Sequence, residues 1–77
     1  MKDADLDIFT FIARLKSAKI AFTLTTVRDD AIMVQIAVPG ERWEVEFFAN
    51  GDIEVERFYG PGAITGKPTI EELFDRC

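Results

Sequence analysis

The first apolar pattern in the chain predicts a helix over residues 5–18. Apolar side chains recur there at intervals of three and four positions, which places them on one side of an α-helix. They are Ile8, Phe11, Ile12 and Leu15, with Leu6 and Phe9 broadening the stripe. Aspartates precede this pattern and Lys16 and Lys19 end it, an order that suits the helix dipole. No Gly or Pro interrupts the segment.

Four segments in which apolar and polar residues alternate come next, and each predicts a β-strand. They cover residues 20–27, 31–38, 42–48 and 53–58. The segments are separated by residues typical of turns, namely Arg28-Asp29-Asp30, Pro39-Gly40 and Asn50-Gly51. Such short connections join antiparallel neighbours, so the sequence predicts a four-stranded antiparallel meander.

Side-chain parity sets the register of each predicted hairpin, because inward residues must face inward residues. A two-residue loop ending at Gly51 would pair Phe47 with Glu54, which mixes the faces. A three-residue loop over 49–51, with Gly51 left-handed, pairs Phe47 with Ile53 instead. The other expected inward pairs are Val45 with Val55, Ile36 with Trp43, Val34 with Val45, Ile32 with Phe47, Leu24 with Val34 and Phe22 with Ile36.

The C-terminal part reads as a loop and a short helix. Residues 59–68 contain three Gly and two Pro, which favours a loop. Thr69 and Glu72 have capping-box spacing, and Ile70, Leu73 and Phe74 give the following helix an apolar side. The chain is therefore predicted to be one two-layer α+β domain over residues 1–77, in the order α-β-β-β-β-α, with both helices on one face of the sheet.

The same register gathers acidic residues on the other face of the predicted sheet. Glu46 is expected opposite Glu54, and Glu44 opposite Glu56. Like charges directly opposite each other destabilise a sheet by about 0.2–1 kcal/mol per pair. On an exposed face, salt and water screen much of that repulsion. Such a concentration of carboxylates therefore invites a functional explanation.

Aromatic and basic residues border the acidic centre, with Arg42 and Phe58 at one end and Phe48 at the other. A polar centre with aromatic edges is typical of a protein-binding patch. The alternative is a solvated face on which glutamates keep the protein soluble, and the sequence leaves both interpretations open. The candidate partner-binding residues are Glu44, Glu46, Glu54, Glu56, Phe48, Phe58 and Arg42.

The composition of the chain excludes several kinds of catalytic and metal-binding site. The chain has no His and a single Cys, Cys77, which excludes His-dependent triads, His-containing zinc sites and an intramolecular disulfide. A flat strand face cannot wrap Ca²⁺ as a loop does, and it offers no cleft for a glycosidase pair. The loop 60–69 departs from a phosphate loop, because Pro61 and Pro68 stand where Gly and Ser or Thr are needed. We expect no enzymatic activity, no metal and no cofactor.

Charge and hydropathy bear on partners and location. The formal net charge is −5, which disfavours nucleic acid and anionic lipid and fits either a basic protein partner or no partner, since negative charge also keeps a protein soluble. The chain contains no run of 18 apolar residues, and its N-terminus does not resemble a secretory signal. With one Cys, these features predict a cytoplasmic protein that does not enter the membrane.

Three segments carry a family resemblance. The runs RDDAIMV (28–34), VPGERWEVEFF (38–48) and GDIEVE (51–56) resemble those of a group of short uncharacterised bacterial proteins, some of which are similar to immunity proteins of toxin systems. The similarity covers roughly the middle half of the chain. It implies a bacterial, cytoplasmic domain of the predicted fold and transfers no catalytic residue.

Two functions follow as expectations. The first is a small non-enzymatic binding module, immunity-like, that presents its acidic sheet face to a basic partner. The alternative is a homodimer that pairs through an edge strand, with the acidic face serving solubility only. Of the predicted edges, strand 53–58 carries Glu54, Glu56 and Arg57, whose charges disfavour pairing with another strand, whereas strand 20–27 has no charged residue.

Overall fold

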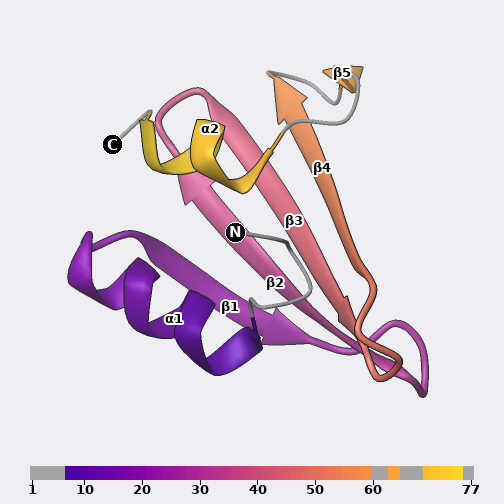
Figure 1. The fold of residues 1–77 in the computed structure, drawn as a ribbon. Coiled ribbons are helices and arrows are strands. Elements are labelled where there is room, and N and C mark those ends of the chain that lie inside the picture. The colour runs from indigo at the N-terminus through magenta and orange to yellow at the C-terminus, as the bar shows by residue number, and fades with distance from the viewer. Residues whose placement is uncertain (1–6, 60–62, 65–68, 76–77) are drawn as a thin grey trace.

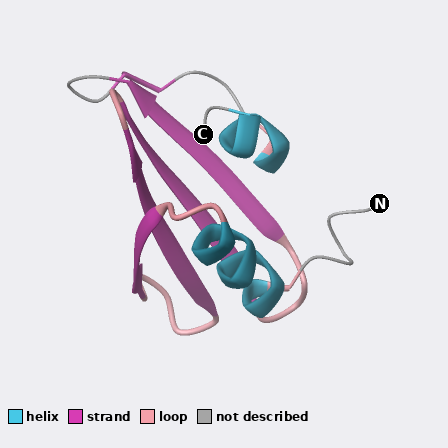
Figure 2. Cartoon of the chain, turned by 90° about the vertical axis from the view of Figure 1, so that its left-hand side faces the viewer, coloured by secondary structure: helices cyan, strands magenta, loops and turns pink. Residues whose placement is uncertain are grey.

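The computed structural model describes residues 7–59, 63–64 and 69–75, and Figure 1 shows their arrangement. The elements are α1 (Ile8–Ser17), β1 (Ala21–Thr25), β2 (Ala31–Val38), β3 (Glu41–Phe48), β4 (Ile53–Tyr59), β5 (Ala63–Ile64) and α2 (Ile70–Asp75). The strands form one antiparallel sheet in the order β1-β2-β3-β4-β5. Both helices lie on the same face of the sheet (Figure 2). The predicted two-layer α+β fold is confirmed.

The predicted register is confirmed at all three hairpins. The inward pairs include Leu24 with Val34, Ile36 with Trp43, Val34 with Val45 and Phe47 with Ile53. Gly51 has the expected left-handed backbone, with φ of 97°. Its N–H donates to the Phe48 carbonyl at 2.9 Å, and the Phe48 N–H donates to the Asp52 carbonyl at 2.9 Å. The glycine therefore lets the chain reverse without exchanging the two faces of the sheet.

The strand β5 is an addition to the predicted fold, which treats residues 59–68 as a loop. Ala63 pairs with Tyr59 and Ile64 with Phe58, so β5 lies along the end of β4. Two residues are too few to show the alternation by which a strand is recognised in a sequence. The last two residues of β4 are therefore not a free edge, in contrast to the expectation. In the described sheet, β1 has β2 as its one neighbour.

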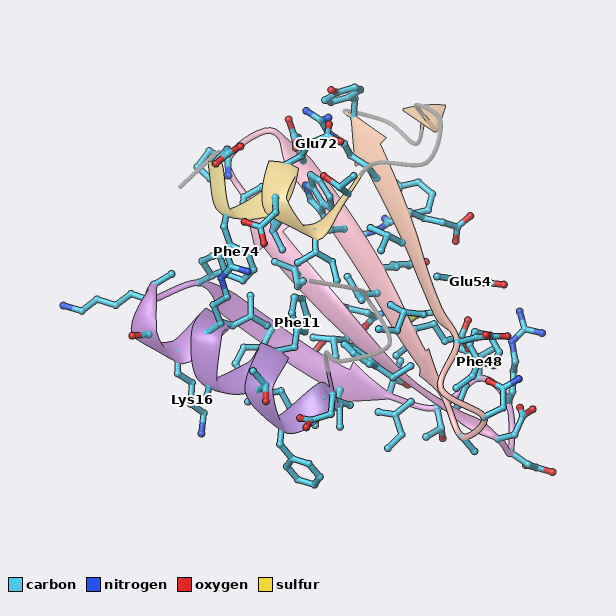
Figure 3. The ribbon with its side chains drawn as sticks, in the orientation of Figure 1. Phe11, Lys16, Phe48, Glu54, Glu72 and Phe74 are labelled. Atoms are coloured by element: carbon cyan, nitrogen blue, oxygen red, sulfur yellow. The ribbon has the colours of Figure 1, made fainter. Side chains whose placement is uncertain are left out.

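The core lies between the sheet and the two helices. Phe11 and Leu15 of α1 are fully buried, as their predicted positions on the apolar stripe require. The Phe11 ring lies 5.4 Å from the Phe47 ring and 6.0 Å from the Phe74 ring, which joins α1, β3 and α2 (Figure 3). Trp43 is also fully buried, which confirms its predicted inward position.

Three apolar residues are more exposed than the sequence analysis expected. Phe9 is 81% exposed, and the prediction that it broadens the core stripe is wrong. Its position is about 100° around the helix from Ile8, which turns it towards solvent. Leu24 and Ile32 are in register with the core face, yet they are 51% and 41% exposed. The end of the sheet that carries them extends beyond both helices (Figure 1).

The N-terminal end of α1 is set by Asp7, whose Oδ1 accepts a hydrogen bond from the Thr10 N–H at 2.7 Å. This bond holds the pKa of Asp7 below its ordinary value. The helix was predicted over residues 5–18, and the observed helix begins at Ile8 and ends at Ser17. Residues 1–6, which include Asp3, Asp5 and Leu6, lie outside the described residues.

The C-terminal end of α1 is a Schellman motif with a lysine at its left-handed position. The Ile20 N–H donates to the Leu15 carbonyl at 3.0 Å, and the Lys19 N–H donates to the Lys16 carbonyl at 3.1 Å. Lys19 has φ of 60°, where a residue with a Cβ is disfavoured by about 1–2 kcal/mol and Gly is usual. The turn places Ile20 in the core at 7% exposure. Core packing thus holds a strained lysine at the start of β1.

Replacing this lysine by glycine is expected to stabilise the protein. Lys19→Gly relieves the left-handed strain, part of which is offset by the greater freedom of glycine in the unfolded chain. We expect the free energy of unfolding to rise by about 0.5–1 kcal/mol in urea titrations. Lys16→Gly, inside the helix, is the matched control and should lower it by up to about 1 kcal/mol. A loss of stability in Lys19→Gly would contradict the role given to this residue.

Candidate functional site

The sheet face opposite the helices, here called the outer face, carries the predicted acidic residues. Glu44 pairs with Glu56 and Glu46 pairs with Glu54 across β3 and β4. The four side chains therefore emerge from adjacent strands on one face, as the register predicted. Neither α1 nor α2 covers this face (Figure 2). These glutamates form the centre of the candidate site.

The four glutamates differ in exposure, although the sequence analysis treated them alike. On β3, Glu46 is 4% exposed and Glu44 is half-buried. On β4, Glu54 and Glu56 are both exposed. The central position of β3, between β2 and β4, explains part of the difference, because residues on both neighbouring strands flank its side chains. The outer face therefore has an inner acidic column on β3 and an outer acidic column on β4.

Each glutamate of the inner column has an arginine partner. Arg28 Nε lies 3.2 Å from Glu46 Oε2, and Arg42 Nε lies 3.7 Å from Glu44 Oε2. These arginines reduce the repulsion between opposed carboxylates. The sequence predicts Arg28 as a turn residue only, and its pairing with Glu46 is unexpected. The alternation rule does not set the direction of a side chain in a turn, so the sequence carried no clear signal for it.

The same two arginines also contact the aromatic residues at the ends of the outer face. The Arg42 guanidinium lies 4.3 Å from the centre of the Phe58 ring, and that of Arg28 lies 5.5 Å from the centre of the Phe48 ring. Both distances are within the range of cation–π attraction. Phe48 and Phe58 are half-buried, so both rings are partly open to a partner. All seven predicted site residues therefore lie on the outer face.

Among the described residues, the outer acidic column has no counter-ion. Within the described part of the chain, neither Glu54 nor Glu56 forms a hydrogen bond or an ion pair. Figure 3 shows Glu54 extending away from β4 into the open. The two side chains lie two residues apart on the same face of one strand. They therefore present two carboxylates that are available to an external cation.

A hollow of about 460 Å³ lies beside the inner column, over β1, β2 and β3. Its lining includes the short side chains of Ala21, Thr23 and Ala37, with Arg42 and Glu44 at its border. Short side chains leave room there for a larger side chain from a partner. The outer face thus combines an open hollow, which has room for an apolar side chain, with exposed carboxylates on β4.

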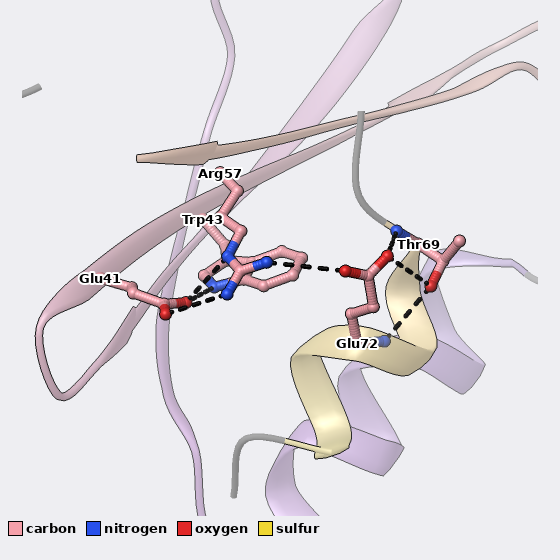
Figure 4. A network of polar contacts seen from close by, with 5 residues as sticks. All are labelled: Glu41, Trp43, Arg57, Thr69 and Glu72. Atoms are coloured by element: carbon pink, nitrogen blue, oxygen red, sulfur yellow. Dashed lines mark hydrogen bonds and ion pairs between the residues drawn. The ribbon is translucent and has the colours of Figure 1, made fainter. Parts of the chain in front are cut away.

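A second charged cluster lies on the helix-facing side, and the sequence analysis did not anticipate it. Trp43 Nε1 donates to Glu41 Oε1 at 2.9 Å, and Arg57 donates to both Glu41 carboxylate oxygens, at 3.2 and 3.1 Å (Figure 4). Arg57 Nη1 also lies 3.5 Å from Glu72 Oε1. Glu72 in turn accepts a bond from the Thr69 N–H at 2.9 Å, which confirms the predicted capping box. The cluster therefore joins β3, β4 and α2.

The alternation of the strands contained the signal for this cluster. Glu41 has the parity of Trp43, and Arg57 has the parity of Val55, so both belong to the inward face. The Glu41 and Arg57 side chains are only 1% and 13% exposed. Hydrogen bonding to Glu41 raises the pKa of Arg57 further above its ordinary value, so the guanidinium stays charged. The expectation that the charge of Arg57 protects an exposed edge strand is wrong, because its side chain lies on the inward face and is bound to Glu41.

A further ion pair joins the two helices. Arg14 Nη1 and Nη2 donate to the two Glu71 carboxylate oxygens, each at 2.8 Å. The Arg14 guanidinium also lies 3.9 Å from the centre of the Phe74 ring. Bonding to Arg14 holds the pKa of Glu71 below its ordinary value. Both glutamates of the first turn of α2 are therefore bound to arginines of other elements, Glu71 to α1 and Glu72 to β4.

Another hollow, of about 500 Å³, lies at the end of the sheet, between the start of α1 and two chain reversals. Aspartates and apolar residues line it, among them Asp7, Asp29, Asp30, Asp52, Ile8, Ile32, Phe47 and Ile53. In the part of the chain that the structure describes, no three His, Cys, Asp or Glu residues are grouped so as to hold a metal ion. This hollow was not predicted, because it is formed by three separate segments.

Comparison with protein-family models, with curated proteins and with solved structures gave no match. The resemblance carried by RDDAIMV, VPGERWEVEFF and GDIEVE therefore stays a prediction, as do the expected absence of enzymatic activity and the cytoplasmic location. Within residues 7–59, 63–64 and 69–75, no helix has the length and apolar character needed to cross a membrane. The geometry of the outer face is thus what bears on function.

The Glu41 cluster predicts a large effect of a single substitution. Glu41→Leu removes the acceptor of the Trp43 indole N–H and the partner of Arg57, both on the inward face. We expect the free energy of unfolding to fall by about 2–4 kcal/mol in urea titrations. Glu41→Gln retains an acceptor and should cost less. Glu54→Leu, on the outer face, is the control and should change stability by no more than about 0.5 kcal/mol; equal losses in Glu41→Leu and Glu54→Leu would contradict the structural role of Glu41.

The pairing of Glu71 with Arg14 predicts a pH dependence. Because the pKa of Glu71 is lowered from 4.5 on folding, its contribution to stability is fully present above pH 4.5. The contribution disappears as the pH falls through the lowered value. Glu71→Gln should therefore be less stable than the wild type near neutral pH, and the two should converge in acid. Thermal unfolding followed by circular dichroism between pH 3 and 7 measures this difference, and a gap that is constant with pH would exclude the pairing as its cause.

Proposed function

We propose that the protein is a small non-enzymatic binding module whose outer face binds a basic protein. The observation that carries the proposal is the contrast between the two acidic columns. Glu44 and Glu46 have arginine partners, whereas Glu54 and Glu56 are exposed and have none within the described residues. Glutamates that served solubility alone would not need arginine partners on β3 and exposed, unpartnered positions on β4, on a sheet face that neither helix covers.

The arginines restrict where a cationic partner can bind. Arg28 and Arg42 repel lysine and arginine side chains from the ends of the inner column. Incoming positive charges are thereby directed to Glu54 and Glu56 on β4. The hollow bordered by Arg42 and Glu44 accepts an apolar side chain of the same partner, and the Arg42 guanidinium at its border also contacts the Phe58 ring. This combination favours a partner in which basic and apolar residues are interspersed.

Long-range electrostatics supports the same assignment. The chain carries a net charge of −5, which raises the rate at which a positively charged protein meets it. The exposed carboxylates then contribute to specificity at short range. An immunity-like role in the cytoplasm, with a basic toxin as partner, rests on the motif resemblance alone and is the narrower form of the proposal.

A titration with a defined basic peptide tests the proposal. The probe is a short peptide in which Arg and Leu alternate, added to ¹⁵N-labelled protein and followed by NMR. We expect shifts concentrated on β4 and on the lining of the hollow. In the double variant Glu54→Gln/Glu56→Gln, the affinity should fall about five- to tenfold, as expected for the loss of two exposed charge contacts.

The control variant is Asp29→Asn/Asp30→Asn, which removes the same charge from the β1–β2 turn. It should bind the peptide as the wild type does, and higher salt should weaken binding to both. Shifts centred on the turn, or equal losses of affinity in the two double variants, would show that net charge rather than the outer acidic column attracts the peptide. Either result would overturn the proposal.

A further inference from the structure

The strand β1 is an uncharged, open edge of the sheet. Its residues, Ala21–Thr25, have β2 as their one strand neighbour in the described sheet. Ala21, Thr23 and Leu24 are exposed, whereas Phe22 on the helix-facing side is half-buried. An edge strand carries unpaired backbone N–H and C=O groups, and natural proteins usually protect such an edge with charge or proline. In β1 neither protection is present.

Exposed apolar side chains lie in β1 and close to it. The large apolar residues that are exposed, among those described, are Phe9, Leu24, Val27 and Ile32. Leu24 lies in β1, Val27 lies two residues beyond the end of that strand, and Ile32 lies at the start of the neighbouring β2. Val27 is 70% exposed. Such a concentration beside an open edge is typical of an interaction surface.

We propose that two copies of this chain associate by antiparallel pairing of β1 with β1 across a two-fold axis. The pairing that uses the whole strand is centred on Thr23, so that Ala21 lies opposite the partner's Thr25 and Phe22 opposite its Leu24. Phe22 and Leu24 are on the inward face of β1, and the axis repeats their contact. The pairing would form two aromatic–aliphatic contacts and would give the unpaired backbone groups of both strands hydrogen-bond partners.

The charges that flank β1 favour a second copy as the occupant. Lys16 and Lys19 precede the strand, and Asp29 and Asp30 follow it. In an antiparallel pair the start of one strand lies beside the end of the other, so the basic end of each copy approaches the acidic end of its partner. Arg28, also in the acidic turn, is bound to Glu46. The strand is thus complementary to itself in charge and in side-chain pattern.

The association uses the edge of β1 and not the outer acidic column, so it does not rest on the proposed function, although Ala21 and Thr23 also line the hollow of the outer face. Glu54 and Glu56 belong to β4, which β2 and β3 separate from β1. A failure of peptide binding at β4 would leave the pairing of β1 intact, and the converse also holds. The strand is short, so a reversible dimer of modest affinity is expected.

Sedimentation equilibrium of the full chain over a wide concentration range tests the proposal. We expect a reversible monomer–dimer equilibrium in the wild type. Leu24→Lys places a charge against the partner strand and should weaken the dimer about tenfold or more. Ala37→Lys adds the same charge on the outer face of β2, where Ala37 is exposed, and should leave the dimer unchanged. Circular dichroism establishes that both variants are folded.

Cross-linking tests the register and does not depend on Leu24→Lys being folded. In a Cys77→Ser background, Thr23→Cys places two thiols opposite each other, at a Cα separation of about 4.5–5.5 Å that suits a disulfide. Mild oxidation should therefore give a covalent dimer. Thr25→Cys is the control, because its thiol would lie opposite Ala21 and should not cross-link. A wild type that remains monomeric at all concentrations, a dimer that Leu24→Lys leaves intact, or faster cross-linking at position 25 than at 23 would each overturn the proposal.

Discussion

The pairing of β3 with β2 and β4 decides which side chains meet on each face of the sheet. A shift of one residue in either hairpin would turn the core side chains outwards and the glutamates inwards. In the observed register, Val45 meets Val34 and Val55, whereas Trp43 meets Ile36 on β2 and lies opposite Arg57 on β4. The two acidic columns on the outer face follow from this register. Core packing thus imposes the clustering of carboxylates from which the candidate function is argued.

The Glu41–Arg57 pair depends on the same register and also protects it. Burying two charges costs free energy, so such a pair is weak evidence for stability by itself. It does penalise alternatives, because a shifted β3–β4 pairing would separate Arg57 from Glu41 and leave a carboxylate on the inward side without its cation. Through Glu72 the pair also joins α2 to the sheet. Its effect is therefore on which structure forms as much as on how stable that structure is.

The parts of the fold that follow from local rules could be predicted from the sequence. Parity and turn residues gave the hairpin registers, and the spacing of Thr69 and Glu72 gave the cap of α2. What could not be predicted depends on how far one element extends over another. Leu24 has the right parity for the core but lies beyond the helices, and Arg28 reaches Glu46 through a long side chain from a turn. For the site, the sequence identified the residues on the outer face but not the difference between its two columns.

The open edge of β1 and the outer acidic column of β4 are separated by β2 and β3, and their chemistry differs accordingly. Exposed apolar residues lie in and next to β1, whereas Glu54 and Glu56, which have no ion-pair partner among the described residues, belong to β4. A protein of net charge −5 can associate with itself only where its own acidic groups are distant or matched by cations, and β1 meets both conditions. Antiparallel pairing of β1 about an axis perpendicular to the sheet would leave both outer faces on the same side. The outer acidic columns of the two copies would then face one direction, so that a partner with two basic segments could bind with an avidity that a single copy cannot provide.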